Sequence, residues 1–344
     1  MDNEKESRTM MHIRTSPKSL YEAIGSLSFS QKKCVIEMGF GSLLDFKIAG
    51  LSSRIVYYLV NNFDDKNLVL NVGAGKIMVT PDLIHDILGV PLGGVQLGNI
   101  DGGEGNDNLV VEWSKQYKDR QISLVDLKTR IARSQEADWN FKINFILLFA
   151  NTIAQCKKRG KCDLSLLDHI REDFRIEQID WCHYVWHAIR GCKDKWKLGV
   201  IGQYFSGPCT LLTLIYVDRT KGIDFEVRRT RPAILTWNNE NLKQREESEV
   251  GSGGFGNVEM REPYEASGAD VENFTVDVNG DIDFVRLNAF KPEGLKGYVY
   301  KISNLFKLLR HNNNSLKETL QEAKEKYPDN DDIKEWETKV SEMM

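Results

Sequence analysis

The densest group of side chains that could bind a metal lies between residues 156 and 192. Its members are Cys156, Cys162, His169, Cys182, His183, His187 and Cys192. His183 and His187 are four residues apart in a segment with helical periodicity, so their imidazoles would share one face, as zinc ligands do. Zinc ligands usually come in pairs two to four residues apart, and the spacing of Cys156 and Cys162 is wider. We therefore interpret these residues as packing groups, with a zinc site as the alternative, and expect no cofactor.

Cys209 is the thiol best placed for nucleophilic catalysis. It follows Pro208 at the expected start of a helix, where the helix dipole lowers the pKa of a thiol. The residues after it, Thr-Leu-Leu-Thr-Leu, are typical of a protein core. A cysteine protease also needs a histidine and an acidic partner near the cysteine, and no cysteine occurs after Gly256. We expect no catalytic residue and no enzymatic activity.

Residues 251–258 match the glycine-rich loop of protein kinases, G-x-G-x-x-G-x-V, whose backbone amides cover the phosphates of ATP. The rest of a kinase does not follow, because the later sequence has no V-A-I-K-like lysine, no H-R-D and no D-F-G. The loop also lacks the preceding strand and following helix of a dinucleotide-binding fingerprint. We interpret this segment as a flexible glycine linker.

Two short basic clusters could contact the phosphates of a nucleic acid. They are Lys157, Lys158 and Arg159 in one turn, and Arg228, Arg229 and Arg231 in another. The second cluster could also serve nuclear import. The chain carries 46 basic and 50 acidic residues, a net charge of −4, which disfavours a protein that coats nucleic acid broadly. Nucleic-acid contact is therefore the less favoured interpretation of both clusters.

The elements that position these residues are specified best at 67–95. Apolar residues alternate along 68–79 on both sides of a glycine turn, as a half-buried β-hairpin requires. Thr80 is then a suitable N-cap, Pro81 fits the first helical position, and Gly89 is a helix stop. This stretch predicts a hairpin followed directly by a capped helix.

The rest of the chain predicts a mainly α fold. Apolar residues recur at helical spacing in 16–27, 31–38, 54–60, 123–132, 140–154, 163–170, 180–189 and 208–217. We divide the chain into a disordered N-terminus (1–13), a helical domain with a hairpin near 67–80 (14–237), a Gly-rich acidic linker (238–283) and a small helical tail (284–344).

Bulk composition is typical of a folded intracellular protein. Hydrophobic residues make up 41% of the 344 residues, enough to bury a core. The charged first residues lack an apolar leader, and no apolar run approaches the ~20 residues that a membrane span needs. We expect a soluble chain with no membrane partner, in a reducing compartment where its cysteines stay free.

Several short motifs occur in a defined order along the first two thirds of the chain. Leu-Gly-Val-Pro-Leu-Gly-Gly closes the hairpin and helix region at 88–94. The others are Met-Gly-Phe-Gly-Ser-Leu-Leu at 38–44, Val-Asn-Asn-Phe-Asp at 60–64, Asp-Trp-Cys at 180–182, Phe-Ser-Gly-Pro at 205–208 and Leu-Leu-Thr-Leu-Ile-Tyr-Val-Asp at 211–218. The series resembles the plant mobile domain, which plant genes share with transposable elements. Residues 14–256 look like the region upstream of the protease domain in plant transposon-encoded ubiquitin-like (SUMO-type) cysteine proteases.

The resemblance implies a function without naming a chemistry. It implies a transposon-derived plant protein, nuclear or cytoplasmic with the nucleus favoured, that acts as a non-catalytic interaction or adaptor domain for a protein partner. One alternative is the targeting or substrate-binding region of a ubiquitin-like (SUMO) protease whose catalytic domain is missing. Another is a chromatin-associated silencing factor, which would bind DNA in a salt-dependent way through Arg228, Arg229 and Arg231. An adaptor should instead expose an apolar patch.

Overall fold

The computed structural model of the chain describes residues 16–73, 75–97, 107–117, 121–154, 161–170, 175–194, 196, 205, 207–264, 317, 319–326, 334 and 338. The expected disordered N-terminus and most of the expected helical tail lie outside these residues. The chain divides into two compact units, Met1–Ser267 and Gly268–Met344. All the labelled elements below belong to the first unit.

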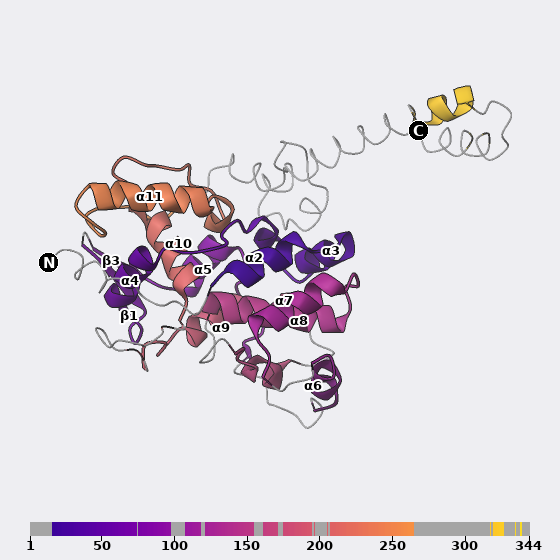
Figure 1. Cartoon of the computed structure of the whole chain (residues 1–344), viewed down its shortest axis with the longest axis horizontal. Coiled ribbons are helices and arrows are strands. Elements are labelled where there is room, and N and C mark those ends of the chain that lie inside the picture. The colour runs from indigo at the N-terminus through magenta and orange to yellow at the C-terminus, as the bar shows by residue number, and fades with distance from the viewer. Residues whose placement is uncertain are drawn as a thin grey trace. The chain divides into compact units, whose positions relative to one another are not determined.

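The described part of the first unit is mainly α-helical with two small antiparallel sheets, which confirms the predicted fold class (Figure 1). Its α-helices include α2 (Lys18–Gly25), α3 (Phe29–Glu37), α4 (Ser53–Asn62), α5 (Pro81–Leu88), α6 (Asp107–Ser114), α7 (Leu124–Arg133), α8 (Trp139–Phe149), α9 (Trp181–Ala188), α10 (Cys209–Arg219) and α11 (Asn239–Gly251). Shorter turns are η1 (Gly41–Asp45), η3 (Ala150–Ala154), η5 (Ser165–His169), η6 (Ile176–Gln178) and η7 (Ala233–Leu235). The sequence predicts neither α6 nor α11.

Helix α3 begins earlier than its apolar pattern suggests, because Ser28 is its N-cap. The Ser28 hydroxyl accepts a hydrogen bond from the Gln31 backbone N–H, and the Gln31 side-chain oxygen accepts one from the Ser28 N–H at 3.0 Å. This capping box satisfies two backbone donors at the helix start. Phe29 therefore becomes the first residue of α3, where its side chain is 77% exposed.

The predicted hairpin and helix are both present. Strands β2 (Val69–Val72) and β3 (Gly75–Met78) pair antiparallel around the glycine turn, with Val72 opposite Gly75. The Thr80 hydroxyl accepts from the Leu83 N–H at 3.1 Å, and Gly89 ends α5 with φ +68°. A third strand, β1 (Phe63–Asp64), pairs with β2 and was not predicted.

The core is built around α8 and α10, which are buried on almost every side. The ring of Phe40, just before η1, makes edge contacts with Phe149 and Trp181 at centroid distances of 4.9 and 5.2 Å. Helix α8 continues into the π-helical turn η3, which is also buried. These contacts join η1, α8 and α9 into one apolar centre.

The prediction of a linker at 238–283 is wrong for residues 239–260, which are folded. Helix α11 occupies Asn239–Gly251 and lies beside α10 (Figure 1), and β5 (Glu259–Met260) pairs antiparallel with β4 (Thr220–Lys221). The face that α11 buries carries Leu242, Arg245 and Glu249. Because two of these three side chains are charged, the segment has no apolar periodicity, and composition alone indicates a solvated linker.

The glycine loop at 251–258 is also folded, so its interpretation as a flexible linker is wrong. The Gly254 N–H donates to the Glu249 carbonyl at 2.8 Å, and the Gly256 N–H donates to the Tyr216 hydroxyl at 3.0 Å. The Phe255 ring lies 5.6 Å from that of Tyr58. These amides hydrogen-bond within the fold, where a phosphate-binding loop would direct them at a ligand.

In the second unit, the described residues 317, 319–326, 334 and 338 are helical. The Gln321 side chain donates to Glu325 one turn later at 2.9 Å. These residues agree with the small helical tail predicted for 284–344.

Candidate functional site

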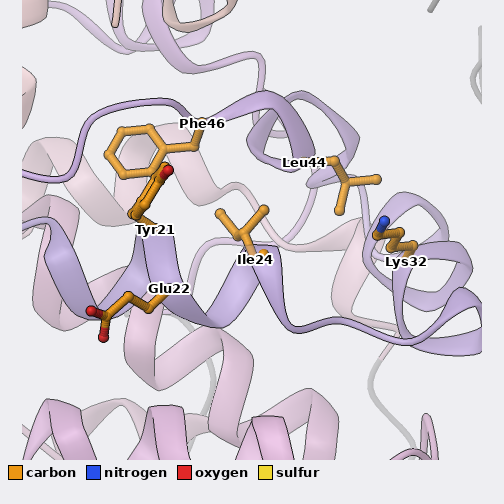
Figure 2. A pocket seen from close by; sticks show the side chains of 7 residues that line it. Tyr21, Glu22, Ile24, Lys32, Leu44 and Phe46 are labelled. Carbon is orange, nitrogen blue, oxygen red and sulfur yellow. The ribbon is translucent and has the colours of Figure 1, made fainter. Parts of the chain in front are cut away.

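An open groove of about 290 Å³, lined by both apolar and polar groups, lies between α2 and η1 (Figure 2). The residues that line it are Tyr21, Glu22, Ile24 and Gly25 of α2, Lys32 of α3, Leu44 of η1, and Phe46. In Figure 2 the rings of Tyr21 and Phe46 lie at one end, Ile24 in the middle, and Leu44 and Lys32 at the other end. Ile24 and Phe46 are 5% and 2% exposed, so they form the floor.

The groove forms because α2 and η1 each have buried side chains next to apolar side chains that stay partly exposed. In α2, Leu20, Ala23 and Ile24 face the core, and Tyr21 lies off that face with 42% of its side chain exposed. In η1, Leu43 is fully buried, whereas Leu44 is only partly covered. Tyr21 and Leu44 therefore leave apolar surface at the edges of the groove.

The two charged residues of the groove differ in their partners. Glu22 Oε2 accepts from Lys128 Nζ of α7 at 2.6 Å, and Lys18 Nζ is 3.8 Å from its other oxygen. The hydrogen bond from Lys128 lowers the pKa of Glu22. In Figure 2 the Glu22 carboxylate points away from Phe46 and Leu44. Lys32 is exposed, and its ammonium has no hydrogen bond or ion pair with any described residue.

The sequence did not identify this groove. It arises where α2 meets η1, and such a meeting is not visible in the periodicity of either element. One signal was present, since Tyr21 and Phe29 are large apolar residues outside the buried positions of their helices.

The candidate arginine cluster at 228–231 is mostly internal. Arg229 and Arg231 both hydrogen-bond to the Asp218 carboxylate of α10. Arg229 donates to its two oxygens at 3.3 and 3.0 Å, and Arg231 donates at 2.9 and 3.0 Å. The Tyr264 ring covers the pair, 4.2 Å from Arg231 Cζ and 5.2 Å from Arg229 Cζ. Arg228 alone is exposed.

Charge balance explains why Asp218 is tolerated inside the fold, where its side chain is 2% exposed. Burial raises the pKa of this carboxyl, but the hydrogen bonds from Arg231 and Arg229 outweigh burial and hold the pKa below its usual value. Arg229 and Arg231 are therefore committed to Asp218. The other cluster, Lys157 to Arg159, lies outside the described residues.

The candidate metal ligands are not brought together where the structure describes them. Cys162 and Cys182 are buried, and His183 Nδ1 lies 2.6 Å from Asp180 Oδ2. His187 is exposed and stacks edge-on against Trp186. Cys156 is outside the described residues, and within them no three His, Cys, Asp or Glu side chains form a group that could hold a metal.

The described thiols are poor nucleophiles. Cys209 begins α10, as predicted, but it is 1% exposed, so a substrate cannot reach its sulfur. Burial raises the pKa of Cys34 to about 11 and also raises the pKa values of Cys182 and Cys192. A thiol with a raised pKa holds its proton at neutral pH and reacts slowly.

The family described as Domain of unknown function (DUF8566) matches residues 13–213, more than half of the chain. The chain belongs to the DUF8566 family. The matched region includes every residue of the groove, and it ends within α10, before the arginine cluster and α11. Comparison of this DUF8566 chain with curated proteins and with solved structures gives no match. Within its described residues, no helix has the length and apolar character needed to cross a bilayer.

Three of the motifs in the DUF8566 region meet at one buried junction. Gly39 has φ +86°, and a Cβ there would lie 2.5 Å from Pro91 Cγ. The Pro91 carbonyl accepts from the Cys182 N–H at 3.1 Å, and Ser42 Oγ donates to the Leu88 carbonyl at 2.5 Å. The glycines and proline of these motifs thus serve close backbone packing. The geometry gives them no evident part in chemistry.

Proposed function

We propose that this DUF8566 chain is a non-catalytic interaction domain that binds a segment of a partner protein in the groove between α2 and η1. The observation that supports the proposal is the groove itself, an open hollow that presents the side chains of Tyr21, Leu44 and Phe46 together with polar groups.

The shape of the groove favours a protein segment over a small-molecule ligand. Its volume of about 290 Å³ lies just below the ~300–1,000 Å³ typical of small-molecule pockets, and it is open to solvent. Its floor is aliphatic and aromatic, and Lys32 is its one charged group without a partner among the described residues. A site of this size suits one or two apolar side chains of a peptide.

The biological setting of the proposal rests on the sequence motifs. Their resemblance to the plant mobile domain supports an adaptor in a transposon-derived plant protein of the nucleus. The targeting or substrate-binding region of a ubiquitin-like protease remains an alternative, because such a region would need a similar surface. The chromatin alternative gains no support from the described residues, since Arg229 and Arg231 are bound to Asp218.

Gly25 allows a direct test of the groove. It lines the groove, it has ordinary backbone geometry, and an added Cβ would meet no atom within 4 Å. A Gly25→Trp chain should therefore fold and fill the groove with its indole. Gly251 at the end of α11 is equally open, lies outside the groove, and provides the matched Gly251→Trp control.

The experiment is quantitative affinity capture from plant nuclear extract with the wild-type, Gly25→Trp and Gly251→Trp chains as baits. We expect a partner that the wild type and Gly251→Trp capture equally and that Gly25→Trp loses. A partner captured equally by all three chains, or no saturable partner at all, would contradict the proposal.

A further inference from the structure

The charges around the groove are unbalanced, and the imbalance identifies the kind of segment that fits it. Glu22 is neutralised by Lys128 of α7 and by Lys18, and it points away from the groove. Lys32 is exposed at the opposite end beside Leu44, without a partner in the described part of the chain. Asp45 lies between Leu44 and Phe46 in sequence but does not line the groove. The groove thus carries apolar side chains at both ends and in the middle, and the positive charge of Lys32 at one end.

A second exposed apolar side chain lies close to Lys32. Phe29 is 77% exposed and lies three residues before Lys32 in α3, so the two side chains share one face of the helix. The Ser28 capping box fixes the first turn of α3 and therefore holds Phe29 in this position. Lys32 consequently neighbours two apolar features, the groove and the Phe29 side chain one turn earlier in α3.

We propose that the partner is a short linear protein segment in which one acidic residue lies between two large apolar residues. One apolar side chain enters the groove over Ile24, the carboxylate pairs with the Lys32 ammonium, and the second apolar side chain packs on Phe29. This inference rests on the proposed function, because it names the ligand chemistry of the same groove. Charge complementarity of this kind fixes the orientation and register of a bound segment.

The test uses random linear peptides displayed on yeast and sorted for binding to the full 344-residue chain. Peptides are kept only if they bind wild type and Gly251→Trp and fail to bind Gly25→Trp. Among these, we expect Asp or Glu between two apolar residues to be strongly enriched. A synthetic peptide of the enriched sequence then gives affinities by fluorescence polarisation.

Two lysine variants separate the role of Lys32 from a general charge effect. Lys32→Glu should lower the affinity for the acidic peptide about fivefold to tenfold. It should raise the affinity for a peptide in which lysine replaces the acidic residue. Lys33→Glu is the matched control, since Lys33 is exposed on the same turn, pairs only weakly with Glu37 at 3.9 Å, and does not line the groove. It should change both affinities much less.

The outcomes distinguish this inference from the proposed function. Groove-dependent peptides without an acidic preference, or equal effects of Lys32→Glu and Lys33→Glu, would overturn the inference and leave the groove as an interaction site. If no selected peptide depends on Gly25, both fail.

Discussion

The Lys128 Nζ of α7 lies 2.6 Å from the Glu22 Oε2 of α2. This ion pair joins two helices that pack together, and it also neutralises the only carboxylate among the described residues that line the groove. Both side chains are partly exposed, at 27% and 35%, so the pair contributes little to stability. Its main consequence is electrostatic, because it leaves Lys32 as the charge that a partner meets.

Replacing Lys128 should therefore separate binding from stability. In Lys128→Met, the Glu22 carboxylate keeps only the weaker contact with Lys18. Its negative charge is then less neutralised, and it repels an acidic ligand at the groove. We expect an acidic peptide to bind more weakly, and we expect urea denaturation to show at most a small change. Lys115→Met, which removes an exposed pair with Glu112, is the control. A large loss of stability in Lys128→Met would mean that the pair is mainly structural.

The arginine pair around Asp218 predicts a large stability effect. Asp218→Ala would remove the carboxylate that both the Arg229 and Arg231 guanidiniums bind, and these side chains are only 17% and 13% exposed. Arg231 would keep only its 3.9 Å contact with Asp86. We expect the free energy of unfolding to fall by about 3–5 kcal/mol, measured by urea denaturation at pH 7. Arg228→Ala, at an exposed position of the same cluster, should cost almost nothing. Equal effects would contradict the assignment of Arg229 and Arg231 to Asp218.

The same carboxylate predicts a pH dependence. Its pKa is lower in the folded chain than in the unfolded chain, so its contribution to stability is present above the ordinary carboxyl pKa and is lost as the pH falls through the folded value. The stability difference between wild type and Asp218→Asn should be constant near neutrality and shrink below about pH 4. A difference that grew in acid would show that the sign is wrong.

Helix α11 should behave as part of the core, although its sequence resembles a linker. Arg245 and Glu249 form an ion pair with side chains 1% and 0% exposed. Either Arg245→Met or Glu249→Leu alone leaves a buried charge and should cost about 3–5 kcal/mol, whereas the double variant should cost less than either one. Lys243→Met, on the exposed face of α11, should be neutral. The readout is urea denaturation; additive losses would contradict a buried pair.

Gly39, in the motif at 38–44, should affect stability without affecting binding when it is replaced. Gly39→Ala would place a Cβ 2.5 Å from Pro91 Cγ at a residue with φ +86°. We expect a loss of about 1–3 kcal/mol in unfolding free energy and unchanged peptide affinity in the folded fraction. Gly50→Ala, where a Cβ meets nothing, is the control. A loss of peptide binding without a loss of stability would give the motif a direct role.

Prediction from sequence succeeded where the determinants are local. The hairpin and α5 follow from alternation, Thr80, Pro81 and Gly89, all within one short stretch. Helix α11 was missed because its buried face carries two charged residues. Arg245 and Glu249 are buried as an ion pair, Glu249 also accepts from the Tyr216 hydroxyl, and Arg245 also donates to Thr220. No apolar pattern reveals such contacts.

The arginine cluster and the groove were harder to predict than the helices, because both depend on contacts between residues far apart in sequence. The arginine cluster was visible as charge, but its partner Asp218 lies on another element, so the sequence suggested phosphate where the fold supplies a carboxylate. The groove combines Tyr21 with Leu44 and Phe46 across a turn and a helix, and neither segment alone indicates a cavity.

The measurement that tests the central claim most directly is site-specific photo-crosslinking in plant cells. A photoreactive phenylalanine analogue replaces Tyr21 at the edge of the groove in one chain, and Ile223, which is 45% exposed and outside the groove, in another. The account predicts a discrete crosslinked protein at position 21 that is absent at position 223 and disappears when Gly25→Trp is added. The same adducts at both positions, or none at position 21, would contradict the claim that this groove binds a partner.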